Sequence, residues 1–203
     1  MPKPPSPICS SSLYGPTTVP GRSPTNSSTV ALRLEWPHPP NMRNMHAFGQ
    51  SGVDLYVRDT YWGTAVPDKD AVPGKVYEHV YFKDQPRAMR DITIYLALYS
   101  PVKVREIGLD RDATVELATP FAVPAPVVFY GTSITQGGCA SRPGMSYQAI
   151  LSRKLNLDFV NLGFSGNGKG EPAVAKMVAE IDASAFVLDF SQNNPTVESL
   201  REV

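Results

Sequence analysis

The sequence predicts two joined units, an all-β sandwich followed by an α/β unit with a parallel sheet. Apolar and polar residues alternate between residues 29 and 119, the period typical of half-buried strands. Beyond residue 120, short apolar runs alternate with segments of helical period, as in βαβ units. Prolines at 120, 124 and 126 punctuate the change. We therefore expect domains over residues 29–119 and 120–203.

Composition and charge exclude several classes of protein. The 203 residues are 42% hydrophobic and 19% charged, which is typical of a globular chain. Lys plus Arg and Asp plus Glu number 19 each, so no net charge favours nucleic acid or an anionic membrane as partner. No apolar run approaches the roughly 18 residues that a membrane span needs. The two cysteines, Cys9 and Cys139, form neither a disulfide framework nor a zinc set.

Residues 1–28 are dominated by Pro, Ser, Thr and Gly. Too few large apolar side chains are present to offset the entropy of ordering this backbone, so we predict a disordered leader. Lys3 is followed by prolines and serines rather than by an apolar stretch, which argues against a signal peptide. The sequence does not define the compartment or the oligomeric state.

Period-two alternation predicts the strands of the sandwich. The apolar members are Val30, Leu32, Leu34 and Trp36; Val53, Leu55 and Val57; Ile92, Ile94, Leu96 and Leu98; Val102, Val104 and Ile107; and Val115 with Leu117. Turn-forming Pro, Gly and Asp separate these runs. No helical period precedes residue 120, which favours an antiparallel sandwich.

The α/β unit is predicted from three strands and intervening helices. Strands are expected at residues 126–130, 158–162 and 185–190, and helices at 145–155 and 172–181. The run at 185–190 is nearly all apolar, which is typical of a strand covered on both faces. A last helix is expected from Pro195, with Asn194 as its N-cap. Its apolar face is still continuing at Val203, so we expect the α/β/α domain to be incomplete.

Polar and glycine residues follow each strand of the predicted parallel sheet, at the edge where open α/β sheets bind ligands. Ser133 follows the first strand, Gly166 the second and Asn193 the third. Each alone is typical of turns and caps. Together they supply a hydroxyl nucleophile and donors for an oxyanion, which is what ester hydrolysis requires.

The segments FYGTSITQGG, NLGFSGNGKG and VLDFSQNNP resemble the first three conserved blocks of the SGNH (GDSL-like) hydrolase superfamily. NMRNMHAFGQSGVDLYV and RDITIYLALY resemble the jelly-roll-like N-terminal module of one branch. The resemblance implies that Ser133 is the nucleophile and that Gly166 and Asn193, with the Ser133 N–H, form the oxyanion hole. Asn194 competes for the role of Asn193, and Thr132 stands where Asp is commoner. It implies esterase activity on small-molecule or carbohydrate esters, with no metal and no organic cofactor.

The family takes its general base from a late Asp-x-x-His motif, and no histidine follows Ser133 in this sequence. His38, His46 and His79 all precede it. His46 is the best candidate of the three, because a loop of the N-terminal module could overhang the site. We expect instead that the chain is the N-terminal part of a longer hydrolase, feebly active without the base and prone to aggregate through an unpaired strand edge.

Two other functions are open. Gly163, Gly168 and Lys169 nearly match a phosphate-binding P-loop, with a Walker B-like run at 186–189, but Gly170 replaces the required Ser or Thr. A non-catalytic sandwich could instead bind carbohydrate through exposed aromatic residues, the candidates being Trp36, Tyr61 and Trp62. Lys169 and Asp182 are read as solvated helix-face residues, and Cys139 as a lining residue near the nucleophile.

Overall fold

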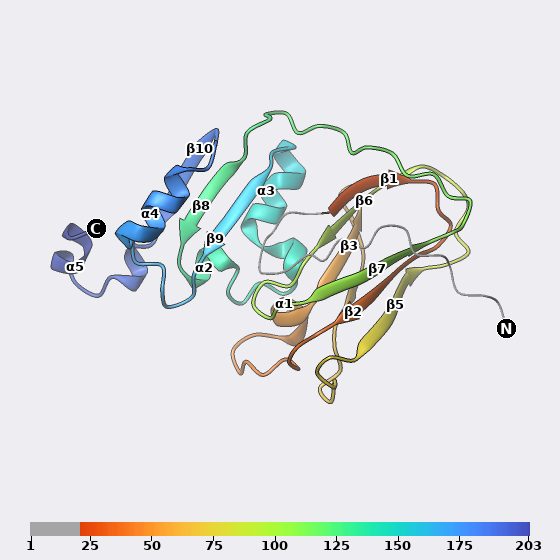
Figure 1. Cartoon of the computed structure of the whole chain (residues 1–203), viewed down its shortest axis with the longest axis horizontal. Helices are drawn as coiled ribbons and strands as arrows, with labels where there is room; N and C mark the ends of the chain where they lie inside the picture. The colour runs from red at the N-terminus through yellow and green to blue at the C-terminus, as the bar shows by residue number, and fades with distance from the viewer. Residues whose placement is uncertain (1–20) are drawn as a thin grey trace.

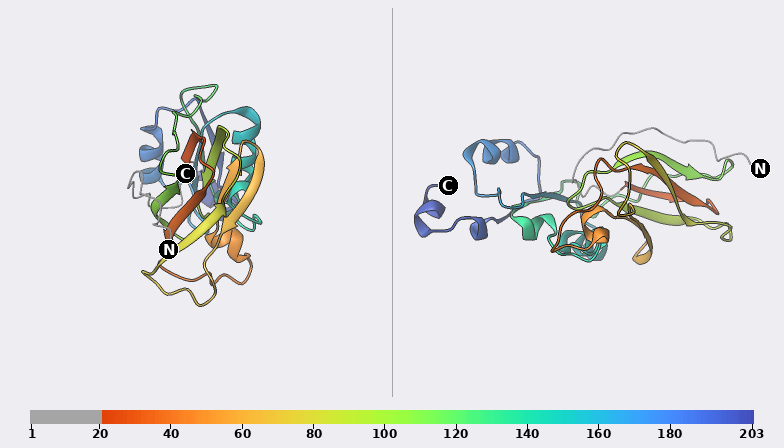
Figure 2. Two further views of the ribbon diagram at one scale, coloured as in Figure 1. Left: turned by 90° about the vertical axis from the view of Figure 1, so that its right-hand side faces the viewer. Right: turned by 90° about the horizontal axis from the view of Figure 1, so that it is seen from below.

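The computed structural model describes residues 21–203, and it contains a β-sandwich (residues 21–109) followed by an α/β unit (residues 127–203) (Figure 1). One antiparallel sheet has the order β1 (Gly21–Thr25), β6 (Arg90–Tyr95), β3 (Val53–Val57), β4 (Thr60–Ala65). The other has the order β5 (Val76–Phe82), β2 (Val30–Glu35), β7 (Lys103–Leu109). Figure 2 shows the sandwich and the α/β unit lying end to end. The predicted two-part fold class is confirmed.

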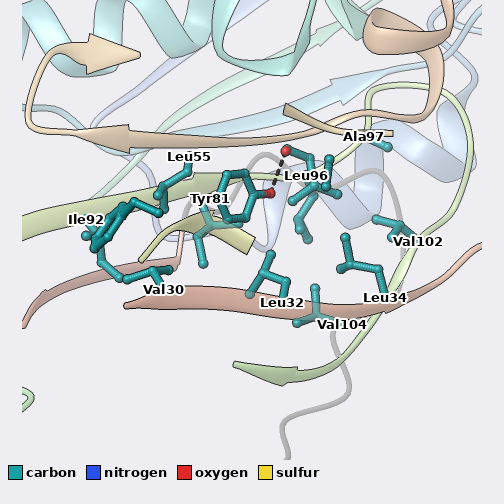
Figure 3. Close-up of a cluster of buried hydrophobic side chains, with 14 of the residues drawn as sticks. Val30, Leu32, Leu34, Leu55, Tyr81, Ile92, Leu96, Ala97, Val102 and Val104 are labelled. Atoms are coloured by element: carbon teal, nitrogen blue, oxygen red, sulfur yellow. Dashed lines mark hydrogen bonds between the residues drawn. The ribbon is translucent and has the colours of Figure 1, made fainter. Parts of the chain in front are cut away.

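The sandwich core lies between its two sheets, as Figure 3 shows. Leu32 and Leu34 of β2 are fully buried and pack with Leu55 of β3, while Arg33 between them is exposed. The Tyr81 hydroxyl donates a hydrogen bond to the Val53 carbonyl at 2.7 Å, so this buried polar group is satisfied. Burial raises the pKa of Tyr81. The alternating pattern therefore places the core correctly in these strands.

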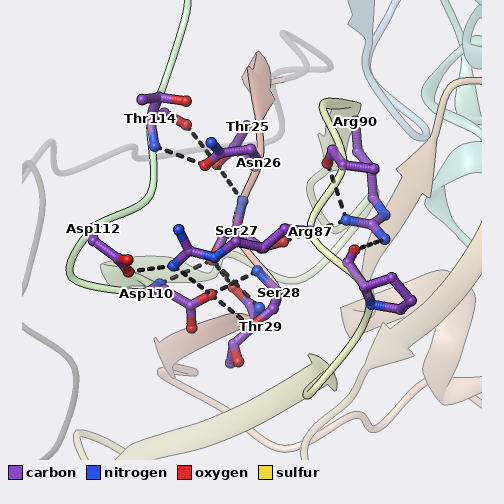
Figure 4. A network of polar contacts seen from close by, with 12 residues as sticks. Thr25, Asn26, Ser27, Ser28, Thr29, Arg87, Arg90, Asp110, Asp112 and Thr114 are labelled. Carbon is purple, nitrogen blue, oxygen red and sulfur yellow. Dashed lines mark hydrogen bonds and ion pairs between the residues drawn. The ribbon is translucent and has the colours of Figure 1, made fainter.

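The predicted disorder is wrong for residues 21–28, and residues 1–20 lie outside the described part of the chain. β1 pairs with β6, and the turn that follows it is held by polar contacts (Figure 4). Asp110 Oδ2 accepts hydrogen bonds from the Ser28 N–H at 2.6 Å and the Ser28 hydroxyl at 2.7 Å. Ser27 is fully buried, and its hydroxyl oxygen accepts the Asp110 N–H at 2.9 Å. Short polar side chains order this segment through hydrogen bonds, which a forecast based on apolar content misses.

Two further differences lie within the sandwich. A five-residue helix, α1 (Ala47–Ser51), occurs where no helix was expected, because it is too short to show a helical period. Val115 forms only an isolated bridge with Thr25, and Leu117 is 97% exposed, so these two residues are not a strand. The segment that contains them leads out of the sandwich toward the α/β unit.

The α/β unit is built on a parallel sheet with the order β10 (Ala185–Asp189), β8 (Val127–Gly131), β9 (Phe159–Gly163). The helical segments are α2 (Ser133–Gln136), η1 (Pro143–Met145), α3 (Tyr147–Leu155), α4 (Pro172–Ala179), η2 (Ser191–Asn193) and α5 (Val197–Arg201). Phe129 of β8 contacts Tyr147 of α3, whereas Val128 and Tyr130 pack with Val178 of α4. Because successive residues of a strand point to opposite faces, α3 and α4 cover opposite sides of the sheet.

The third strand and the last helix differ from expectation. β10 is not covered on both faces: Phe186, Val187 and Leu188 are 45%, 37% and 63% exposed. The N-cap of α5 is Thr196, not Asn194, and Thr196 forms a capping box with Ser199. The Asn194 amide instead donates to the carbonyls of Lys169 and Phe190. An apolar run predicts a strand, but its burial depends on what packs against it.

Candidate active site

Ser133 lies at the carboxyl end of the central strand of the parallel sheet, where β9 and β10 depart to opposite sides. Such a reversal of strand order leaves a crevice at the strand ends. Gly131 and Gly163 end the paired strands β8 and β9. A Cβ on Gly131 would lie 2.1 Å from Thr135 Oγ1, and one on Gly163 would lie 2.0 Å from the Gln136 nitrogen. These two glycines therefore allow α2, which begins with Ser133, to pack directly on the strand ends.

Buried polar groups hold α2 in place. The Thr132 hydroxyl caps α2 by accepting the Ile134 N–H at 3.3 Å. The Thr135 carbonyl accepts hydrogen bonds from Gln148 Nε2 at 2.7 Å and Asn161 Nδ2 at 2.8 Å. Gln148 is fully buried and Asn161 is 7% exposed. Sequence reasoning missed both amides, although a polar residue within an otherwise apolar strand, as at Asn161, is a usable signal.

The sandwich also contacts the nucleophile turn. The Tyr99 hydroxyl donates to the Ser133 carbonyl at 3.1 Å, and the Gly138 N–H donates to the same oxygen at 2.7 Å. The Gln136 side chain accepts the Ser165 N–H at 2.9 Å and donates to the Leu98 carbonyl at 3.1 Å. α2 thus bridges the loop after β9 and the loop after β6, so the position of Ser133 depends on both units.

A cavity opens at Ser133 and is lined from both units. The α/β unit and the sandwich contribute Ser133, Ile134, Gly138, Cys139, Ser165, Met42, Asn44, Met45 and Tyr99. Cys139 lines the cavity, as the sequence predicted, and its thiol donates to the Asn44 carbonyl at 3.2 Å. Burial raises the pKa of Tyr99, against a smaller opposing effect of its hydrogen bond with Ser165. Tyr99 therefore stays protonated near neutral pH, and the lining contains no Lys, Arg, Asp or Glu side chain.

The structure does not bring the predicted oxyanion residues Gly166 and Asn193 into the lining of this cavity. Gly166 adopts a left-handed conformation, φ +72°, in the loop after β9. Asn193 Nδ2 donates to the Gly168 carbonyl at 3.0 Å and more distantly to that of Phe164. In this conformation the Asn193 amide connects the segment after β10 to the loop after β9. The role of Asn193 as an oxyanion donor stays a prediction.

None of the three histidines lines the Ser133 cavity. His46 directly follows Met45, a lining residue, so the expectation that its loop approaches the site is partly met. Its Nδ1 accepts the Phe48 N–H at 3.3 Å, which places the proton of the neutral ring on Nε2. His38 is exposed, and His79 lies in β5, where burial lowers its pKa.

The aromatic candidates for sugar contact are engaged within the fold. Trp36 is 3% exposed and donates to the Ser51 carbonyl at 2.8 Å, which excludes it as a surface platform. Trp62 packs on Phe82, with ring centroids 4.8 Å apart. One face of the Tyr61 ring contacts the Arg142 guanidinium, 4.0 Å from the ring centroid, although Tyr61 is 41% exposed. These contacts weaken the reading of the sandwich as an independent carbohydrate binder.

Neither a P-loop nor a metal site is supported in the described chain. Gly168 packs on the Gly131 carbonyl, and α4 begins only at Pro172, so Lys169 does not open a helix as a P-loop lysine does. Within residues 21–203, no group of three His, Cys, Asp or Glu side chains could hold a metal ion. Helices in this part of the chain are too short or too polar to cross a membrane.

Strand β3 joins the two units. Asp54 is fully buried; its Oδ2 accepts the Gly144 N–H at 2.8 Å and lies 3.6 Å from Arg142 Nε. Burial raises the pKa of Asp54, and the hydrogen bonds from Thr64 and Gly144 oppose that rise. The Tyr56 ring lies 4.2 Å below the Arg153 guanidinium. Alternate residues of β3 thus face the sandwich core and the segment around α3, so this strand contacts both units.

Fold and site define the class of protein, a three-layer α/β unit with a Gly-Thr-Ser turn after its central strand and a β-sandwich before it. Residues 124–203 match the GDSL-like lipase/acylhydrolase family, and residues 22–115 match the N-terminus of SGNH-hydrolase-type esterases. The chain belongs to the SGNH (GDSL-like) hydrolase superfamily, in the branch with an N-terminal module. No curated protein matches the chain.

Solved structures show the same architecture. A Bacteroides ovatus protein described as a GDSL-like lipase is 37% identical, with a TM-score of 0.76 over 89% of this chain and 56% of its own. The salicylyl-acyltransferase SsfX3 of a tetracycline biosynthetic pathway is 21% identical, with a TM-score of 0.65. The match covers 85% of this chain and 47% of the SsfX3 chain. A Clostridium thermocellum family two carbohydrate esterase solved with cellohexaose is 13% identical, with a TM-score of 0.60. The match covers 87% of this chain and 60% of the esterase chain. These last two show the fold alone. The chain therefore spans about half the length of these structures.

Proposed function

We propose that the protein is a serine hydrolase of small-molecule or carbohydrate esters, with Ser133 as the nucleophile. The observation that carries this proposal is the position of Ser133, the first residue of α2 at the end of the central strand, opening into a cavity. The first N–H groups of a helix lack an intrahelical acceptor, so the Ser133 N–H is available to an oxyanion. Because a family two carbohydrate esterase shares this fold, carbohydrate esters are included with small-molecule esters among the substrates proposed for testing.

The chemistry begins when Ser133 Oγ forms a bond to the ester carbonyl carbon. The carbonyl electron pair moves onto oxygen, where the N–H groups of Ser133 and Gly166 are the proposed donors; Asn193 joins them if its amide leaves the Gly168 carbonyl. Collapse breaks the bond to the alkoxy oxygen, and the alcohol leaves with a proton. Water then hydrolyses the acyl-serine, which releases the carboxylic acid and restores Ser133.

The serine proton needs an acceptor. No histidine follows Ser133 in the sequence, and the three that precede it are outside the cavity. In this chain the proton passes to a base from solvent, such as a buffer anion or hydroxide. Loss of a positioned base costs several orders of magnitude in related chemistry. We therefore expect slow acylation of Ser133 by activated esters and slow turnover.

The test is incubation of the 203-residue chain with p-nitrophenyl acetate, followed by release of p-nitrophenolate and by mass spectrometry. We expect one acetyl group to appear on the peptide that contains Ser133. Ser133→Ala should abolish it, whereas Ser141→Ala, at an exposed serine of the next loop, should not. Equal acetylation of the Ser133→Ala variant would contradict the nucleophile assignment and favour a non-catalytic binding role.

A further inference from the structure

Gln50, the fourth residue of α1, is a buried polar residue that forms hydrogen bonds with two residues lining the Ser133 cavity, Met42 and Tyr99. It is 3% exposed. Its Oε1 accepts the N–H groups of Asn41 at 3.1 Å and Met42 at 3.0 Å. Its Nε2 donates to Asn41 Oδ1 at 3.2 Å and to the Ser100 hydroxyl at 2.9 Å. Both polar atoms of this buried amide are thus satisfied, as burial requires.

The backbone of Gln50 holds a second segment. Its carbonyl accepts the N–H groups of Tyr99 at 3.2 Å and Ser100 at 2.9 Å. One residue therefore ties together the loop that carries Met42 and the loop that carries Tyr99. Both of these residues line the cavity at Ser133.

The cavity lining contains no Lys, Arg, Asp or Glu side chain, and its apolar side chains come from both units. Met42 and Met45 come from the sandwich, and Ile134 and Cys139 face the same cavity from the α/β unit. Met45 is 6% exposed and fixed in the fold, whereas Met42 is partly exposed and Ile134 is 54% exposed. Thioether side chains adapt to unbranched apolar groups. The polar groups in the lining are neutral, so an anionic acyl group would be desolvated without a counter-ion.

We propose that Met42 and Met45, positioned by Gln50, form the acyl-binding wall of the Ser133 cavity, so that the N-terminal module selects linear, uncharged acyl groups longer than acetyl. This inference rests on the proposed function of Ser133. Met42 and Met45 determine specificity by contact with the acyl chain. Gln50 is a positioning residue, because it acts only through the loops that it holds.

The first experiment compares acylation of Ser133 by p-nitrophenyl acetate and butyrate. We expect a preference for butyrate, and Met42→Ala should reduce the butyrate-to-acetate rate ratio by about tenfold, the usual size for loss of apolar contact with one or two methylenes. Met89→Ala is the matched control, since Met89 is 42% exposed and outside the cavity lining. An unchanged ratio in Met42→Ala would overturn the acyl wall while leaving Ser133 as the nucleophile.

Gln50 is tested by Gln50→Met, which keeps the length of the side chain and removes its hydrogen bonds. The butyrate-to-acetate ratio should fall as in Met42→Ala, while acetate acylation changes less. Gln50→Glu keeps the acceptor for the N–H groups of Asn41 and Met42 and should restore part of the ratio. If Gln50→Met lowers the acetate and butyrate acylation rates by the same factor, Gln50 supports the fold and does not position the acyl-binding wall. If Gln50→Met does not fold, the comparison of Met42→Ala with Met89→Ala decides whether the acyl-binding wall exists.

A readout independent of catalysis uses chains labelled with ¹³C at the methionine methyl groups. Butyramide, a neutral analogue that carries the butyryl group, should shift the Met42 and Met45 methyl signals more than acetamide does, and the Met89 signal should stay in place. If esters leave Ser133 unmodified but these shifts appear, the proposed nucleophile fails and the wall stands. If esters acylate Ser133 and neither methyl responds, the wall is overturned and the nucleophile stands. If neither occurs, both are overturned.

Discussion

The sandwich and the α/β unit bury their strands differently. In β2, Val30, Leu32 and Leu34 are fully buried between two sheets. In β10, Phe186, Val187 and Leu188 are each more than a third exposed, although four of the five residues of this strand are apolar. Figure 1 shows β2 inside the sandwich and β10 at the edge of the parallel sheet. Composition therefore identifies a strand, but its position in the sheet sets how much it contributes to stability.

The largest expected effect breaks the sandwich core. Leu32→Ala should lower the free energy of unfolding by about 3 kcal/mol, because it removes a fully buried side chain and leaves a cavity. Leu188→Ala, the matched change in β10, should cost about 0.5 kcal/mol, since Leu188 is 63% exposed. Urea unfolding of both variants measures the difference. Similar costs would mean that β10 is as well covered as β2.

A second prediction concerns the contact between the two units. Asp54→Ala should cost about 2.5 kcal/mol, because it leaves the buried Gly144 N–H and the Arg142 guanidinium without their carboxylate. Asp91→Ala is the control, since the Asp91 side chain is 52% exposed and pairs with the exposed Arg58. Urea unfolding should show almost no change for the control. Equal, small costs would show that the units are held without the Asp54 contact.

The smallest effect is a pH dependence at the turn after β1. Burial favours neutral Asp110, but the hydrogen bonds from Ser28 and its neighbours outweigh this and lower the pKa of Asp110. The stability from Asp110 is therefore present above its unfolded pKa of about 3.9 and is lost as pH falls through the lower folded value. Asp110→Asn should weaken the acid sensitivity of unfolding below about pH 4 by on the order of 1 kcal/mol. An identical pH profile in that variant would exclude this role.

Much of the fold could be predicted because its strands carry regular patterns. The alternation of Leu32 and Leu34 with Arg33 correctly predicted β2 and the face that it buries. The turn at residues 26–29 was missed, because its order comes from hydrogen bonds to Asp110, which is distant in sequence. The covering of β10 was also wrong, because apolar content does not report what lies beside a strand.

The candidate site was predictable where its residues follow strands. Ser133 and Cys139 follow β8 closely along the chain, and both line the cavity. The cavity wall from Met42, Met45 and Tyr99 was not predicted, because these residues come from loops of the sandwich with no periodic pattern. Gln50 was missed for the same reason, since its partners lie about nine and about fifty residues away.

The sequence by itself determined the two-part architecture, the strand that leads to Ser133 and the superfamily whose blocks it resembles, because these features depend on local pattern and spacing. Only the tertiary structure decided which residues share the cavity and that the Asn193 amide contacts the Gly168 carbonyl. It also decided that Gln50 joins the two sandwich loops that carry the lining residues Met42 and Tyr99. These arrangements arise from contacts between distant segments, whose geometry is set by packing of the whole chain rather than by neighbouring residues.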